Sequence, residues 1–196
     1  MDERDLDRDP LRQFERWFEE ARAAGLPVPE AMTLATAAAD GRPSARMVLL
    51  KAADERGFGF HTNYESRKGQ ELGENPRAAL LFHWQQLGRQ VRIEGGVERV
   101  AAEESEAYFR TRPVGSRLAA WASPQSRPLA DREELDRLYA GAREAYGSEV
   151  PLPPHWGGFR VRPDAYEFWQ HGDDRLHDRV RYERDGAAWR RTRLAP

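Results

Sequence analysis

The segment from Arg46 to Lys51 constrains the fold most strongly, because its four central residues are all apolar. Successive side chains of an extended strand point to opposite faces, so this segment presents apolar side chains on both faces. A strand of that kind is covered on both faces in a folded protein. The core of a small barrel would supply one cover, and we expect a helix or a second subunit to supply the other.

Strand signals on either side of this segment predict an antiparallel meander. Met32–Thr36 precedes a turn at 40–43, and Phe58–Thr62 follows a turn at 55–57. Along the whole chain we expect roughly seven or eight strands and three or four helices, in an order that is not βαβ, with separate strands at Gly158–Val161 and Ala165–Trp169. The predicted fold class is therefore α+β, with a closed or partly closed antiparallel barrel and helices packed outside it.

The N-terminal part predicts a helix. Asp9 is a favourable N-cap, Pro10 suits the first turn, and Gly25 ends a run of apolar residues at helical spacing. Asp2 to Arg8 form a largely charged lead, and we expect residues 1–9 to be mobile. The length of 196 residues suits a single domain over 1–196.

Charge balance and residue types exclude several classes of function. With 31 Lys and Arg against 33 Asp and Glu, the net charge of −2 argues against a nucleic-acid partner held by bulk electrostatics. Without cysteine there are no disulfides, thiolate nucleophiles or Cys-based zinc sites, and the five His show no metal-ligand spacing, so no metal is predicted. No apolar run resembles a signal peptide or could span a bilayer, so we expect a cytoplasmic protein without a membrane partner.

Two groups of residues would suit phosphate. At Ser66-Arg67-Lys68, a predicted N-cap and two cations lie beside the free N–H groups of a helix start. Tyr108 and Arg112 are four apart on a predicted helix, and Ser116 can cap the next one. Each group alone also fits a bland alternative, namely a capped surface helix for the first and a packed Tyr with a surface Arg for the second.

The stretch Arg175–Arg179 suggests a reactive surface. If it is extended, Arg175, His177 and Arg179 project to one face and make an anion-binding surface that can also move protons. The alternative is a solvated edge strand, since charged strand faces are common on protein surfaces.

In their order along the chain, these residues resemble the pyridoxamine (pyridoxine) 5′-phosphate oxidase family, FMN-dependent enzymes of the split-barrel fold. The resemblance extends from about Pro10 to Pro196. The stretches that carry it are Arg46–Lys51, Thr62-Asn63, Ser66–Lys68, Arg89–Val91, Gln125-Ser126, Trp156–Arg160, Phe168–Gln170 and Arg175–Arg179.

The resemblance implies a homodimer with FMN in the interface, with residues 156–196 as the C-terminal dimerisation and substrate-site segment. The implied FMN ligands are Arg46, Met47, Val48, Leu49, Leu50, Lys51, His61, Thr62, Arg67, Lys68, Gln90, Gln125, Ser126, Trp169 and Arg179. The implied substrate ligands are Lys51, Tyr108, Arg112, Ser116, Arg175, Leu176 and His177, of which Arg175 and His177 would be catalytic.

Three features depart from the family pattern. His61 stands where the family usually has Tyr, and His171 where it often has Gly. The chain also begins late, and we expect it to lack the N-terminal arm that covers the substrate in longer members.

The resemblance implies oxidation of pyridoxamine 5′-phosphate or pyridoxine 5′-phosphate to pyridoxal 5′-phosphate, with O₂ as acceptor giving H₂O₂, in vitamin B6 salvage and biosynthesis. One alternative is a related split-barrel flavin oxidase acting on another ring system, such as a phenazine precursor. The other is a non-catalytic protein that binds FMN or pyridoxal phosphate.

Overall fold

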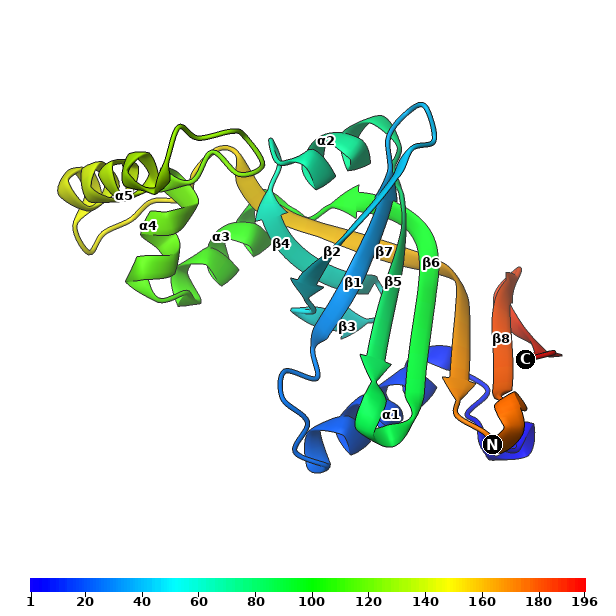
Figure 1. Cartoon of the computed structure of the whole chain (residues 1–196). Coiled ribbons are helices and arrows are strands. Elements are labelled where there is room, and N and C mark those ends of the chain that lie inside the picture. The colour runs from blue at the N-terminus through cyan, green and yellow to red at the C-terminus, as the bar shows by residue number, and fades with distance from the viewer.

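A computed structural model, which describes all 196 residues, contains one curled antiparallel sheet of nine strands (Figure 1). The strands are β1 (Ala31–Ala37), β2 (Pro43–Leu49), β3 (Ala52–Asp54), β4 (Gly57–Asn63), β5 (Arg77–Trp84), β6 (Arg89–Arg99), β7 (Trp156–Gln170), β8 (Asp178–Asp185) and β9 (Ala188–Leu194). The main order is β2-β1-β5-β6-β7-β4-β3, and β8 pairs with both β7 and β9. The predicted α+β class with an antiparallel, partly closed barrel is confirmed, with more strands than expected.

Five α-helices lie around the sheet (Figure 1). They are α1 (Pro10–Ala23), α2 (Arg67–Glu74), α3 (Ala102–Thr111), α4 (Val114–Ala122) and α5 (Arg132–Tyr146). None of them is long and apolar enough to cross a membrane.

The long strand β7 organises the sheet. It pairs with β6 along one edge, while its other edge pairs first with β4 and then with β8. The change of partner falls near Pro163, which has no N–H to donate to a neighbouring strand. Opposite it, the β6 register shifts between Glu94 and Gly95, as the Gly95-Gly96 pair predicts. A side chain at Gly95 would collide with the backbone of Arg162, so this bend requires glycine. The two strands expected over 158–161 and 165–169 are therefore one bent strand.

Helix α1 covers the barrel core. It begins as predicted, because the Asp9 carboxylate accepts a hydrogen bond from the Leu11 N–H at 2.9 Å. It ends where Gly25 adopts a φ of +70°. The fully buried Phe14 packs edge-on against Phe58, with ring centroids 4.9 Å apart.

A second, smaller core fixes α3, α4 and α5 against the start of β7. Phe109 and Trp156 form its centre, with ring centroids 5.0 Å apart. Since Trp156 begins β7, this core holds α3 and α4 beside β4, which pairs with the same end of β7.

The expected double cover of the segment 46–51 is not completed within one chain. Strand β2 is an edge strand that pairs only with β1, and Met47 and Leu49 are 61% and 41% exposed. Leu50, just beyond the strand, is buried in the core. No helix lies over the open face of β2, so the helix that was one of the two expected covers is absent.

The N-terminal residues also differ from expectation. Residues 1–9 were expected to be mobile, yet Leu6 is buried in the main core. Tyr182 on β8 donates its hydroxyl to the Asp7 carbonyl at 2.8 Å, and Arg191 on β9 donates to the Glu3 carbonyl at 2.9 Å. The segment is therefore tied to the C-terminal strands.

Candidate functional site

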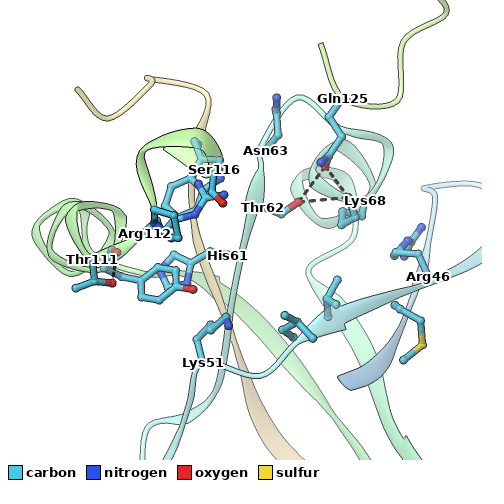
Figure 2. A pocket seen from close by; sticks show the side chains of 16 residues that line it. Arg46, Lys51, His61, Thr62, Asn63, Lys68, Thr111, Arg112, Ser116 and Gln125 are labelled. Atoms are coloured by element: carbon cyan, nitrogen blue, oxygen red, sulfur yellow. Dashed lines mark hydrogen bonds between the residues drawn. The ribbon is translucent and has the colours of Figure 1, made fainter. Parts of the chain in front are cut away.

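A cavity of about 520 Å³ opens between β2, β4, the start of α2 and the α3–α4 pair (Figure 2). Sixteen residues line this cavity, and twelve of them are among the FMN and substrate ligands that the family resemblance implies. These twelve are Arg46, Met47, Val48, Leu49, Lys51, His61, Thr62, Lys68, Tyr108, Arg112, Ser116 and Gln125. Arg46 and Lys51 are five residues apart, so in a regular strand their side chains would face opposite ways. They line one cavity because β2 ends at Leu49, before Lys51 is reached.

One side of the cavity is the predicted phosphate-type site at the start of α2. Ser66 caps the helix by accepting from the Gly69 N–H, as predicted. Lys68 Nζ donates to Gln125 Oε1 at 2.8 Å and to Thr62 Oγ1 at 3.3 Å. Burial, reinforced by the nearby positive charge of Arg46, lowers the pKa of Lys68. A partly desolvated ammonium beside a hydroxyl and free helix N–H groups suits an anion.

The two arginines of this region are held by one carboxylate. Arg46 Nη2 and Arg67 Nε donate to the two oxygens of Glu71 at 3.2 and 2.8 Å. Arg67 does not line the main cavity but a neighbouring surface cavity of about 320 Å³. Arg67 and Lys68 therefore leave the helix start in different directions.

Arg112 and Ser116 lie on the other side of the cavity (Figure 2), and Tyr108 lines it there beside His61. The Arg112 guanidinium carbon lies 4.7 Å from the Trp156 ring centroid, and its buried Nη1 has no hydrogen-bond partner. Burial lowers the pKa of Arg112. A desolvated guanidinium with a free donor is a strong site for a phosphate or a carboxylate.

The helix boundaries predicted for this group were wrong in detail. Helix α3 ends at Thr111, so Arg112 is extended rather than on a helix face with Tyr108. Pro113 occupies the N-cap of α4, and Ser116 lies inside that helix instead of capping it. The Pro at 113 explains both differences, because it disfavours a helical residue before it and suits the start of a helix.

His61 lies on the same side of the cavity as Arg112 and Ser116 (Figure 2). Its ring stacks on Trp156 at a centroid distance of 5.2 Å, and both of its buried nitrogens lack hydrogen-bond partners. Burial lowers the pKa of His61 to about 4, with the positive charges of Arg112 and Lys51 acting in the same direction and Glu104 opposing them. His61 is therefore a neutral aromatic wall at pH 7.

A second group of sequence-predicted residues lies on β6, β7 and β8. Gln90, Trp169 and Arg179 are directly opposite one another across the three strands, so their side chains share one face of the sheet. The His177 ring packs beside Trp169, with centroids 4.6 Å apart. The Gly172 N–H donates to His177 Nδ1 at 3.2 Å, which leaves the proton of a neutral ring on Nε2.

Arg175–Arg179 is not extended throughout, so the condition for a shared face of Arg175, His177 and Arg179 is not met. Asp173–Arg175 forms a 3₁₀ turn, and Asp174 and Arg175 have φ values of 52° and 63°. Leu176 is 72% exposed, and β8 begins only at Asp178. The segment is a turn that presents its side chains at the end of the sheet, because left-handed backbone reverses the chain there.

Within one chain, the residues that line the main cavity lie far from the group around Trp169 and His177. Trp156 and Trp169 lie near the two ends of the 15-residue strand β7, about 40 Å apart along it. The sequence-predicted residues that do not line the main cavity are Leu50, Arg67, Gln90, Ser126, Trp169, Arg175, Leu176, His177 and Arg179. Each chain thus carries the sequence-predicted residues in two separate groups.

Sequence reasoning gave no role to Trp156, Glu71 or Glu167. Trp156 lines the cavity, whereas Glu71 and Glu167 are buried carboxylates that hold arginines. The i,i+4 spacing of Arg67 and Glu71 in the sequence could have predicted their ion pair. Likewise, the charged Glu167 between the apolar residues Tyr166 and Phe168 could have predicted a buried carboxylate that needs a cationic partner.

Comparison with known proteins identifies relatives along the whole chain. Residues 18–146 match the family described as pyridoxamine 5′-phosphate oxidase, and residues 156–196 match the pyridoxine 5′-phosphate oxidase C-terminal dimerisation region. A pyridoxine/pyridoxamine 5′-phosphate oxidase of Rubrobacter xylanophilus is 61% identical over 97% of this chain and 88% of its own length. The protein of that name from Burkholderia multivorans is 59% identical over 100% of this chain and 93% of its own length.

Two solved structures are similar to this one. PhzG from Burkholderia lata 383, in complex with tetrahydrophenazine-1-carboxylic acid, has a TM-score of 0.92 and 39% identity, covering 98% of this chain and 95% of its own. A pyridoxamine 5′-phosphate oxidase-related, FMN-binding protein from Nostoc punctiforme has a TM-score of 0.76 and 17% identity, covering 97% and 100%. The second likeness concerns the fold alone.

Proposed function

The chain belongs to the pyridoxamine 5′-phosphate oxidase family, and on this premise we propose that it oxidises pyridoxamine 5′-phosphate or pyridoxine 5′-phosphate to pyridoxal 5′-phosphate with bound FMN. The alcohol and O₂ would give the aldehyde and H₂O₂. The amine, O₂ and water would give the aldehyde, ammonia and H₂O₂. In both cases the substrate carbon loses two electrons and O₂ gains them.

The observation that carries this proposal is the pair of anion sites on the two sides of the main cavity. Lys68 and Thr62 form one, and Arg112 and Ser116 form the other, within one cavity of about 520 Å³. A single phosphorylated ligand needs only one such site. Two of them fit two phosphorylated ligands that meet, as FMN and a phosphorylated substrate would.

The residues present fit FMN. The start of α2 offers a hydroxyl, a partly desolvated ammonium and helix N–H groups to one phosphate. The cavity between the two anion sites is lined by apolar β2 residues and by the aromatic ring of His61. When bound, FMN would supply the redox chemistry by accepting hydride and passing its electrons to O₂.

The chain's own groups would bind and orient the substrate. Tyr108, Arg112 and Ser116, with Lys51 nearby, would hold its phosphate, so that binding energy remote from the reacting carbon orients that carbon. His177 would donate a hydrogen bond from Nε2 to the substrate ring, since its Nδ1 is occupied by the Gly172 N–H. Arg175 would lie beside it as a second, cationic donor.

A homodimer would unite the two groups of residues, each of which would be a partial site. The group around Trp169 and His177 is too far from the cavity of its own chain to contact a ligand there. The apolar face of β2 is open, with Met47 and Leu49 exposed at the cavity. The match of residues 156–196 to a dimerisation region supports a second subunit that covers this face and contributes its C-terminal residues.

A second candidate function is oxidation of a phenazine-type ring, favoured by the likeness to PhzG with its bound tetrahydrophenazine carboxylic acid. Arg112 could hold a carboxylate as well as a phosphate. Tyr108 and Ser116 line the same cavity and favour phosphate, because two hydroxyls and a guanidinium can supply donors to its three terminal oxygens.

An absorption spectrum tests the proposal. The purified protein is expected to show a flavin spectrum that is bleached by anaerobic pyridoxamine 5′-phosphate and restored by air, with pyridoxal 5′-phosphate as product. Bleaching by a dihydrophenazine carboxylate alone would favour the second candidate. A colourless protein that also fails to bind added FMN would rule out both.

A further inference from the structure

We infer that Glu71 and Glu167 are positioning residues, each of which fixes the direction of one ligand-binding arginine by accepting a hydrogen bond from its Nε. The arginines are Arg67 and Arg179, which line no part of the main cavity of one chain and which the resemblance implies as FMN ligands, so this inference rests on the proposed binding of FMN. Glu71 accepts from Arg67 Nε at 2.8 Å, and Glu167 accepts from Arg179 Nε at 2.9 Å. Both glutamate side chains are only 6% exposed.

Glu71 is held rigidly. Thr36 Oγ1 and Ser44 Oγ each donate to its Oε2 at 2.5 Å, and Arg46 Nη2 donates to the same oxygen. Its other oxygen, Oε1, is left for Arg67. Burial opposes the charged form, but the hydrogen bonds outweigh it and lower the pKa of Glu71 to about 2. The carboxylate is therefore ionised and fixed at any working pH.

Glu167 has the equivalent role on the sheet. It lies opposite Arg92 on β6 and Arg181 on β8, one row from Trp169 and Arg179 on the same face. Its Oε2 accepts from Arg92, and its Oε1 accepts from Arg179. A charged residue in this otherwise apolar stretch of β7 is retained by these two partners.

The bond to Nε determines what each arginine can offer. A guanidinium is planar, so a partner on Nε fixes the plane and the direction of the two terminal nitrogens. The two terminal nitrogens of Arg67 make no hydrogen bond within the chain, and the Arg67 side chain is 57% exposed. Arg179 uses Nη1 for the Ala195 carbonyl and keeps Nη2. Each arginine thus presents free donors in a fixed direction.

For Glu71→Gln, a purely electrostatic effect of the carboxylate and a positioning effect on Arg67 predict opposite changes in FMN affinity. The carboxylate repels an anionic ligand, so Coulomb's law alone predicts tighter FMN binding when its charge is removed. Positioning predicts weaker binding, because Arg67 loses its fixed plane. We expect the apoprotein of Glu71→Gln to bind FMN about tenfold more weakly. Binding at least as tight as in the wild type would overturn the inference.

Riboflavin separates positioning from a merely structural role. It lacks the phosphate proposed to lie at the start of α2, so Glu71→Gln should leave riboflavin affinity within about twofold of wild type. A general loss of structure would weaken both ligands. Glu74→Gln on the same helix is the matched control, because Glu74 is exposed and pairs with no arginine. It should leave both affinities unchanged.

Double variants show whether each glutamate acts through its arginine. In an Arg67→Ala background, Glu71→Gln should have little further effect on FMN affinity, since Arg46 keeps its bonds to Leu34 and Thr36. An undiminished tenfold loss in that background would overturn the inference. Likewise, Glu167→Gln should weaken FMN binding in the wild-type background but have little further effect on FMN affinity in an Arg179→Ala background.

Arg67→Lys avoids any change in the core and keeps the charge. We expect the same roughly tenfold loss of FMN affinity, because an ammonium has no plane for Glu71 to fix. Wild-type affinity in Arg67→Lys would contradict the inference even if Glu71→Gln did not fold. A wild-type apoprotein that binds neither FMN nor riboflavin would instead refute the proposed function, and this inference with it.

Discussion

The imidazole of His61 stacks on the phenol ring of Tyr108, with centroids 4.3 Å apart and planes inclined by 24°. Tyr108 belongs to the proposed substrate phosphate site, and His61 lies on the same side of the cavity. An uncharged imidazole whose nitrogens have no hydrogen-bond partner acts there as an aromatic support for the Tyr108 ring. Because it forms no hydrogen bond with Tyr108, it leaves the Tyr108 hydroxyl to a ligand.

The low pKa of His61 predicts a loss of stability in mild acid. Its pKa is lowered from 6.5 to about 4 on folding, so the unfolded chain binds a proton more readily between these values. The free energy of unfolding should therefore fall as the pH drops through this range, by at most about 2 kcal/mol between pH 7 and pH 5 from this group. Urea unfolding of the apoprotein at both pH values measures it.

His61→Phe is the control for this pH effect. The ring is kept and the titrating group is removed, so the variant should lose less stability than the wild type between pH 7 and pH 5. The other four histidines are common to both proteins and cancel in the comparison. Equal losses in both proteins would mean that His61 titrates normally.

Arg112→Ala should separate substrate binding from flavin binding. The variant removes a desolvated guanidinium that, on our proposal, holds only the substrate phosphate. We expect a rise in KM for pyridoxamine 5′-phosphate of about ten- to hundredfold, with flavin content near that of the wild type. Steady-state kinetics and flavin stoichiometry measure both. Loss of FMN with an unchanged KM would show that the two anion sites are assigned the wrong way round.

Lys68→Ala is the counterpart on the other side of the cavity. It should lose flavin first and activity only as a consequence, so that added FMN restores turnover with an unchanged KM for substrate. Titration of the variant with FMN during assay tests this. A variant that keeps its flavin but binds substrate poorly would contradict the assignment.

Local signals were sufficient for the elements that begin with a cap. Asp9 and Ser66 start helices as expected, because one side chain and one N–H decide each case. The turn at Asp174 and Arg175 could not be predicted in this way. Left-handed backbone at residues other than glycine is imposed by the surrounding structure and leaves no mark in composition or periodicity.

The arrangement of the site depended on contacts far apart in the sequence. The resemblance supplied the residues of both partial sites, but their separation follows from β7 running unbroken through Pro163, where two strands were expected. The roles of Glu71 and Glu167 likewise required the register that places Arg179 near Glu167 and the fold that brings Ser44 to Glu71.

The open face of β2 predicts a dimer that a single charge can disrupt. Leu49→Glu should give a monomer by light scattering with greatly reduced FMN affinity, since a buried unpaired charge is costly at an interface. Leu138→Glu on α5 is the matched control, because Leu138 is also 41% exposed. It should remain dimeric and retain FMN. A Leu49→Glu dimer with bound FMN would refute the assignment of this face to the interface.

Subunit mixing tests whether each site is shared between two chains. Arg112→Ala and His177→Ala should each be poorly active alone, because each removes one partial site from both active sites of its dimer. In a mixed dimer, one site carries both substitutions and the other carries neither. After denaturation and random reassembly of equal amounts, activity should recover to about a quarter of the wild-type value, since half the dimers are mixed and half of their sites are intact. The measurement is turnover at low substrate concentration before and after mixing. If Arg112 and His177 of one chain served the same site, mixing would restore nothing.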